Sequence, residues 1–150
     1  MKTKARWVSV FLLTVSIFVL AELPVAARQI NIAAKTILAS NEGTYLDPGL
    51  GPLIGELQSV FRYSSYRLLS QDRLSLGINQ TGSVSLPGGR TLQITPSGIS
   101  GNRAEMRLSI LKKGRQVFNT VVQLRNGASV TVGGPKHKGG FLLFNIFASF

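Results

Sequence analysis

The chain has 150 residues and a formal net charge of +11, with 17 Lys and Arg against six Asp and Glu. It contains no cysteine, which excludes disulfides, cysteine-based metal sites and a lipid-anchored lipoprotein. A chain of this length suits one domain with a modest core.

The first 27 residues have the layout of a secretion signal. Three basic residues within Met1–Arg6 precede an apolar run from Trp7 to Ala21. Val25-Ala26-Ala27 then supplies the small residues that a signal peptidase reads. An uncleaved membrane anchor is the alternative, but the run is shorter than the about 20 residues of a spanning helix. We therefore predict cleavage near Ala27 and a periplasmic or secreted location.

Residues 28–150 would then form a single β-rich domain that is strongly basic. Three of the basic residues and one of the acids lie before residue 28, so the remaining net charge is about +9. Such a charge favours anionic partners. For an exported protein these would be anionic envelope polymers or lipid headgroups rather than nucleic acid, although the basic residues are scattered and form no single run.

The first predicted elements are a strand and a helix. Residues 29–40 are apolar and uncharged apart from Lys35, which predicts a strand. Asp47-Pro48 should begin a helix, because Asp caps free amides and Pro suits the first turn. Apolar residues then recur at spacings of three and four, so this helix should pack on a sheet. They are Leu50, Leu53, Ile54, Leu57, Val60 and Phe61.

Alternation of apolar and polar residues predicts strands through the rest of the chain. The strands expected are 73–80, 90–95, 103–110, 116–124 and 128–132, with turns at Pro87-Gly88-Gly89 and Lys112–Arg115. Asn126-Gly127 predicts a two-residue hairpin. Phe141–Phe150 is apolar on both faces and suits a central strand. The predicted fold class is α+β, with one N-terminal strand and one helix packed on a mainly antiparallel sheet or small sandwich.

Residue types that support catalysis are sparse after residue 27. His137 is the one histidine, and it lies between Lys136 and Lys138, with no acid nearby to orient it. The five carboxylates show no pairing, and neither a nucleophile-elbow sequence nor metal-ligand spacing occurs. We therefore predict a non-enzymatic protein without a metal or a cofactor.

The first candidate binding segment is the glycine-rich stretch Gly133–Gly140. Its free backbone amides could form an anion-binding concavity beside Lys136, His137 and Lys138. The alternative is a mobile hairpin between the last two strands. The segment is not a nucleotide phosphate loop, because the Gly-Lys-Ser/Thr ending is missing.

The second candidate segment contains Arg62, Tyr63, Tyr66 and Arg67. Aromatic rings beside arginines can stack on sugars or anchor a protein partner. The alternative is a junction between helix and strand whose tyrosines cover the edge of the core.

The C-terminal residues leave another alternative open. Apolar residues recur at every second position from Leu142 to a terminal Phe150. This pattern is similar to the last strand of bacterial outer-membrane barrels. Such barrels need at least eight strands of about ten residues, whereas several strands predicted here are short and a helix interrupts them.

Two stretches resemble known proteins. Val121–Gly134 resembles a valine-rich hairpin with Asn-Gly and Gly-Gly found in secretins, the outer-membrane channels of secretion and pilus systems, but the chain is far too short to be a secretin. Most of residues 28–150 resembles small uncharacterised exported bacterial proteins, through Tyr66–Leu69, Leu86–Arg90 and Gly133–Pro135. This resemblance implies an envelope location and no established activity.

The leading functional prediction is a non-enzymatic periplasmic interaction module of an envelope assembly or secretion system, whose partner is an envelope protein. The alternative is a binding protein for an anionic envelope glycan or lipid, with only transient or peripheral membrane contact. A small outer-membrane β-barrel is a further alternative.

Overall fold

The computed structural model describes residues 28–150, and the predicted secretion signal lies outside these residues. The described part contains eight strands and two short helices. The elements are β1 (Ile30–Ser40), the 3-10 helix η1 (Pro48–Leu50), α1 (Leu53–Val60), β2 (Ser65–Leu76), β3 (Gly82–Leu86), β4 (Arg90–Ser100), β5 (Arg103–Lys112), β6 (Arg115–Arg125), β7 (Ala128–His137) and β8 (Gly140–Ser149). Within 28–150, no helix is long and apolar enough to cross a membrane.

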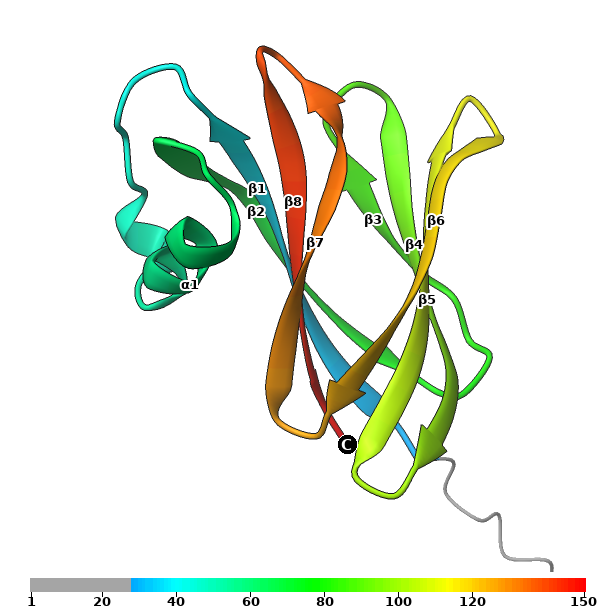
Figure 1. Cartoon of the computed structure of the whole chain (residues 1–150). Coiled ribbons are helices and arrows are strands. Elements are labelled where there is room, and N and C mark those ends of the chain that lie inside the picture. The colour runs from blue at the N-terminus through cyan, green and yellow to red at the C-terminus, as the bar shows by residue number, and fades with distance from the viewer. Residues whose placement is uncertain (1–27) are drawn as a thin grey trace, which may run out of the picture.

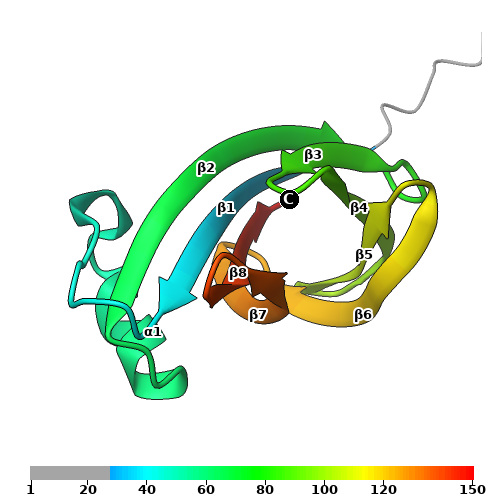
Figure 2. The same ribbon diagram turned by 90° about the horizontal axis from the view of Figure 1, so that it is seen from above.

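The strands form two antiparallel sheets of four strands each, which pack face to face (Figures 1 and 2). Sheet A has the order β2-β1-β8-β7, and sheet B has the order β3-β4-β5-β6. The two sheets do not close into one. The expected helix on an antiparallel sheet is confirmed, but the fold is more strongly β than the α+β prediction implies.

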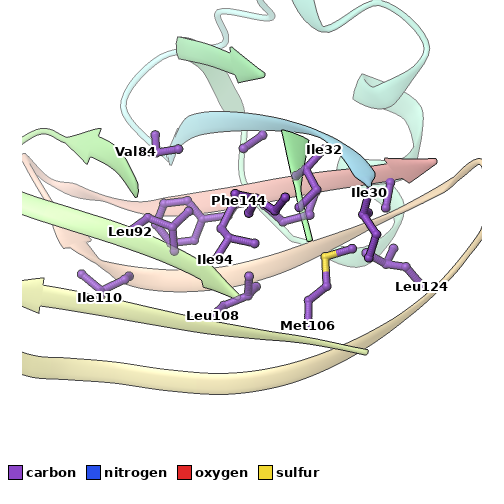
Figure 3. Close-up of a cluster of buried hydrophobic side chains, with 14 of the residues drawn as sticks. Ile30, Ile32, Val84, Leu92, Ile94, Met106, Leu108, Ile110, Leu124 and Phe144 are labelled. Atoms are coloured by element: carbon purple, nitrogen blue, oxygen red, sulfur yellow. The ribbon is translucent and has the colours of Figure 1, made fainter. Parts of the chain in front are cut away.

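The main core lies between the two sheets. β5 shows the origin of this core most clearly. Ala104, Met106, Leu108 and Ile110 are all fully buried, whereas the charged residues that alternate with them are exposed. This is the alternation predicted for 103–110. Ser109 departs from this pattern, since it is only 9% exposed. Side chains from the two sheets point toward one another across this layer (Figure 3).

A second core lies on the outer face of sheet A, beneath the helical segment. Ile37, Ala39 and Leu143 of the sheet pack there against Leu50 and Leu57. Asp47 caps the segment as predicted, since its Oδ1 accepts from the Gly49 amide at 2.9 Å. The helix itself is shorter than predicted.

Residues 51 and 52 divide the predicted helix into η1 and α1. Gly51 has a φ of 50°, outside the helical region, and α1 starts only after Pro52. The eight residues of α1 therefore cover only part of the outer face of sheet A.

The central strands of sheet A come from the two ends of the described chain. β1 pairs with β8 along its length, from Asn31 opposite Ser149 to Ser40 opposite Gly140. β8 lies between β1 and β7, so its prediction as a central strand is confirmed.

Several predicted boundaries were wrong. β2 begins at Ser65, well before the expected start at residue 73, and Ile78 lies in the turn that follows it. β4 continues past Thr95 to Ser100, with an irregularity between Pro96 and Gly98 that accommodates the proline. β3 was not predicted.

The predicted turn at Asn126-Gly127 is present, but the strands on its two sides do not pair with each other as a hairpin. β6 belongs to sheet B and β7 to sheet A, so the turn connects the sheets instead of pairing two neighbouring strands. The Asn126 amide donates to the Asn102 carbonyl at 3.0 Å, and the Gly127 amide donates to the Ala148 carbonyl at 2.8 Å. The turn therefore contacts both sheets.

The glycine-rich segment is also not the long loop that was predicted. β7 continues to His137, with an irregular register between Gly133 and Lys136, and only Lys138 and Gly139 form the turn. Gly134 lies against Phe144, since a Cβ added at Gly134 would overlap the Phe144 ring. The segment is thus packed strand and provides no open concavity of backbone amides.

Candidate functional site

The two predicted binding segments meet at one end of sheet A. The Lys136 Nζ lies 5.9 Å from the centroid of the Phe141 ring. The Tyr63 ring lies on the other segment, with its centroid 6.0 Å from that of Phe141. Phe141 therefore connects Lys136 to Tyr63, two residues that are far apart in the sequence.

Tyr66 does not belong to an accessible site. Its side chain is fully buried, and its hydroxyl donates to the Phe61 carbonyl at 2.6 Å, with the Leu57 carbonyl at 3.2 Å. Burial raises the pKa of Tyr66, so the phenol remains a protonated donor. We correct the prediction for this residue: Tyr66 holds the end of α1 and has no free surface for a ligand.

The two arginines of that segment have different surroundings. The guanidinium of Arg67 lies 4.7 Å from the centroid of the Tyr45 ring, a cation–π arrangement on the chain that precedes η1. Arg62 is exposed. Both arginines are thus exposed and Tyr63 is half-buried, but Arg67 already stacks on an aromatic ring of the same chain.

His137 is held next to an arginine that the sequence did not single out. The Arg90 guanidinium donates to the Lys136 carbonyl at 3.1 and 3.2 Å, and its Nη2 lies 3.4 Å from the His137 Nδ1. Burial lowers the pKa of His137, and the charges of Arg90 and Lys138 lower it further. The imidazole is thus neutral at neutral pH, and its contact with Arg90 supplies no carboxylate to orient it as a base.

A groove elsewhere on sheet A was not predicted. It has a volume of about 870 Å³ and lies between the outer face of the sheet and the helical segment. Leu50, Pro52, Leu53 and Glu56 line it from the helical side. The groove exists because the short helical segment covers only part of that face.

The floor of the groove is made of two rows of residues that run across the sheet. In one row, Lys35 lies opposite Gln71 on β2 and opposite Asn145 on β8. In the neighbouring row, Ala33 lies opposite Arg73 and opposite Phe147. The floor thus combines polar groups with an aromatic ring that is 38% exposed.

Lys35 and Arg73 are diagonal neighbours on adjacent strands of this floor. Residues in this relation lie about 7–8 Å apart, close enough for both side chains to contact one bound group. Glu56 is the one carboxylate among the residues that line the groove. Both cations line the groove, where a ligand can reach them.

Asn145 is fixed in the floor beside Lys35. It is only 5% exposed, and its Nδ2 donates to the Thr131 Oγ1 at 3.0 Å and to the Ser129 Oγ at 3.4 Å. These bonds hold the amide in one orientation at the base of the groove.

Two isolated polar residues in the sequence mark this groove. Lys35 is the one charged residue in 29–40, and Asn145 is the one amide in the apolar segment 141–150. A lone polar residue in an apolar strand often marks a face that is not fully covered. The register that brings the two together could not be obtained from the sequence.

The described residues contain no group of three or more His, Asp or Glu side chains that could hold a metal ion. Comparison with known proteins found no matching family model, no matching curated protein and no matching solved structure.

Proposed function

We propose that this protein is a non-enzymatic, exported binding module of the cell envelope, and that its groove holds an anionic ligand with an apolar part. The ligand class is an envelope lipid or a lipid-linked glycan. The observation that carries the proposal is the groove itself, with Lys35 and Arg73 side by side on a partly apolar floor.

The size of the groove supports a small ligand over a flat protein contact. A volume of about 870 Å³ lies within the range of about 300–1,000 Å³ that is typical of small-molecule sites. Apolar walls with a few fixed polar groups are also typical of such sites. Leu50, Leu53 and Phe147 would contact the apolar part of the ligand, and Asn145 would fix its polar part.

The charged residues that line the groove favour a ligand with negative charge. Lys35 and Arg73 lie on the sheet, whereas Glu56 lies on the helical wall. An anionic group would therefore bind on the sheet side, away from Glu56. The net charge of about +9 on residues 28–150 would further raise the local concentration of anions.

Binding of decyl phosphate, measured by titration calorimetry at low salt, tests this proposal. Substitution of Lys35→Gln or Arg73→Gln should each weaken binding by about threefold to tenfold, and Glu56→Gln should strengthen it. Binding of wild-type protein should also weaken as salt is added.

Two controls make the result specific to the groove. Lys112→Gln removes the same charge from sheet B and should leave the affinity unchanged. Decyl glucoside has the same alkyl chain without the charge and should bind more weakly than decyl phosphate. Equal losses of decyl phosphate affinity in Lys112→Gln and Lys35→Gln would contradict a groove site, because the effect would then come from net charge alone.

A second candidate function is an interaction module that binds an envelope protein. The cluster of Tyr63, Phe141 and Lys136 favours it, because two segments distant in sequence meet there with aromatic and basic groups. Cross-linking in the cells that make the protein would test it. Loss of a cross-linked partner in a Tyr63→Ala variant, with the Gln93→Ala variant on β4 retaining it, would support this surface.

A further inference from the structure

β6 is an edge strand whose outer side is unpaired within residues 28–150. It pairs with β5 along sheet B, and sheet B ends at β6. β7 follows it in the chain but belongs to sheet A, and Figure 1 shows the two strands diverging from their shared turn. The backbone groups of β6 that point away from β5 therefore lack a neighbouring strand in the described chain.

The other three sheet edges are protected in ways that natural proteins commonly use. At the start of β2, the Tyr66 amide donates to the Tyr45 carbonyl at 2.8 Å, and the Asp47 amide donates to the Tyr66 carbonyl at 3.0 Å. β3 has only five residues. β7 has an irregular register near Pro135, and Arg90 caps its Lys136 carbonyl.

β6 has one irregularity near its start, where its register with β5 shifts at Val117, and its pairing is regular from Phe118 to Arg125. The nine residues Gln116–Leu124 include no charge, no proline and no glycine, and are rich in valine. Val117 and Val121 are 53% and 51% exposed. A long uncharged edge of this kind is a template for another strand.

The charges at the ends of β6 specify what that strand would be. Arg125 lies opposite Arg103, and Arg115 lies opposite Lys112, so both ends have like charges side by side. Like charges in directly opposite positions are unfavourable. An acidic group placed beside each end would relieve that repulsion.

The same charges disfavour pairing of β6 with a second copy of itself. Antiparallel pairing centred on Thr120 would place Arg115 of one copy beside Arg125 of the other, at both ends of the interface. A partner with an apolar centre and acidic ends avoids this.

We propose that β6 is a docking edge for an extended segment of a partner protein, with a β-prone centre and Asp or Glu at both ends. The segment adds to sheet B as a fifth, neighbouring strand. Its backbone bonds to the free edge of β6, and its acids lie beside Arg115 and Arg125. This site lies on sheet B and does not depend on the groove of sheet A.

Hydrogen exchange with a synthetic peptide tests the proposal. The probe is a peptide of alternating valine and threonine with two glutamates at each end, added to isotopically labelled protein. The β6 amides that point away from β5 should gain protection, because they acquire hydrogen-bond partners. A version with lysines in place of the glutamates should bind at least about tenfold more weakly.

A charge-reversed variant sharpens the test. Arg115→Glu should weaken binding of the glutamate-ended peptide by about threefold or more, and it should strengthen binding of the lysine-ended peptide. The fold should tolerate it, because the new carboxylate faces Lys112. Arg62→Glu reverses a charge at a distance from β6 and should change neither affinity.

Three results would overturn the proposal. The first is the absence of peptide-induced protection in β6. The second is equal binding of the two peptides, which would show that the charged ends do not select the partner. The third is a dimer protected at β6 without peptide, which would make a second copy the occupant.

Discussion

Tyr66 contributes to the fold through its hydroxyl, although the sequence placed it among candidate binding residues. The hydroxyl bonds carbonyls at the C-terminal end of α1, from a position on β2 beneath the helix. We expect Tyr66→Phe to lower the free energy of unfolding by about 1–3 kcal/mol, because it leaves buried carbonyl groups with fewer donors. Urea unfolding would measure this change.

Tyr63→Phe is the matched control for that substitution. It also removes one phenol hydroxyl three residues away, yet the side-chain contacts of Tyr63 with Tyr66 and Phe141 are between rings, and its hydrogen bond to Tyr66 comes from the backbone amide. Its effect should lie within about 0.5 kcal/mol of zero, as for most surface changes. Equal effects of the two substitutions would show that the hydroxyl of Tyr66 does not anchor the helix.

At the scale of single elements, local patterns predicted strands best where one face is buried and the other is exposed. β5 satisfies this condition, and its alternation of buried and exposed residues was predicted correctly. β1 and β8 were also predicted, because apolar runs of that length suit central strands. In these three strands the apolar pattern of the local sequence agrees with the structure that the tertiary contacts stabilise.

Long-range pairing could not be predicted in the same way. Asn126-Gly127 gave a correct turn, but whether the flanking strands pair depends on the sheet that each one joins. Here the Asn126 side chain pairs instead with Phe150, as its Oδ1 accepts from the Phe150 amide at 2.9 Å. The groove escaped prediction for the same reason, since the pairing of Lys35 with Asn145 joins residues from the two ends of the domain.

The glycines of β7 provide a test of that element. Gly134→Ala should lower the free energy of unfolding by about 1–3 kcal/mol, because its Cβ would overlap the Phe144 ring and lie 3.0 Å from the Leu142 carbonyl. Gly133→Ala is the control, since the nearest atom to its Cβ would belong to the Phe61 ring, at 4.0 Å. In a mobile loop both substitutions would be neutral or slightly stabilising, so a difference between them supports packed strand.

At the scale of the whole molecule, the two cores share the strands at the centre of sheet A. Leu142 points between the sheets, whereas the next residue, Leu143, packs beneath the helical segment. β1 divides its residues in the same way, with Ile32 in the main core and Ile37 in the second. Loss of either core would therefore remove support from strands that the other core requires.

This sharing predicts that a chain starting at Arg28 unfolds in one cooperative step. The three tyrosines, Tyr45, Tyr63 and Tyr66, all lie near the helical segment, and the one tryptophan precedes residue 28. Tyrosine fluorescence thus reports on the helical end, whereas far-ultraviolet circular dichroism reports mainly on the strands. The two signals should change at the same urea concentration.

Substitution on either side of sheet A should move both signals together. Leu142→Ala in the main core and Leu143→Ala in the second core should each cost about 2–5 kcal/mol. Leu143→Ala could instead lower the urea midpoint seen by tyrosine fluorescence and leave the midpoint seen by circular dichroism unchanged. The helical segment would then be a separate folding unit that can open while the two sheets stay intact. The groove would then change shape with that opening, because η1 and α1 form one of its walls.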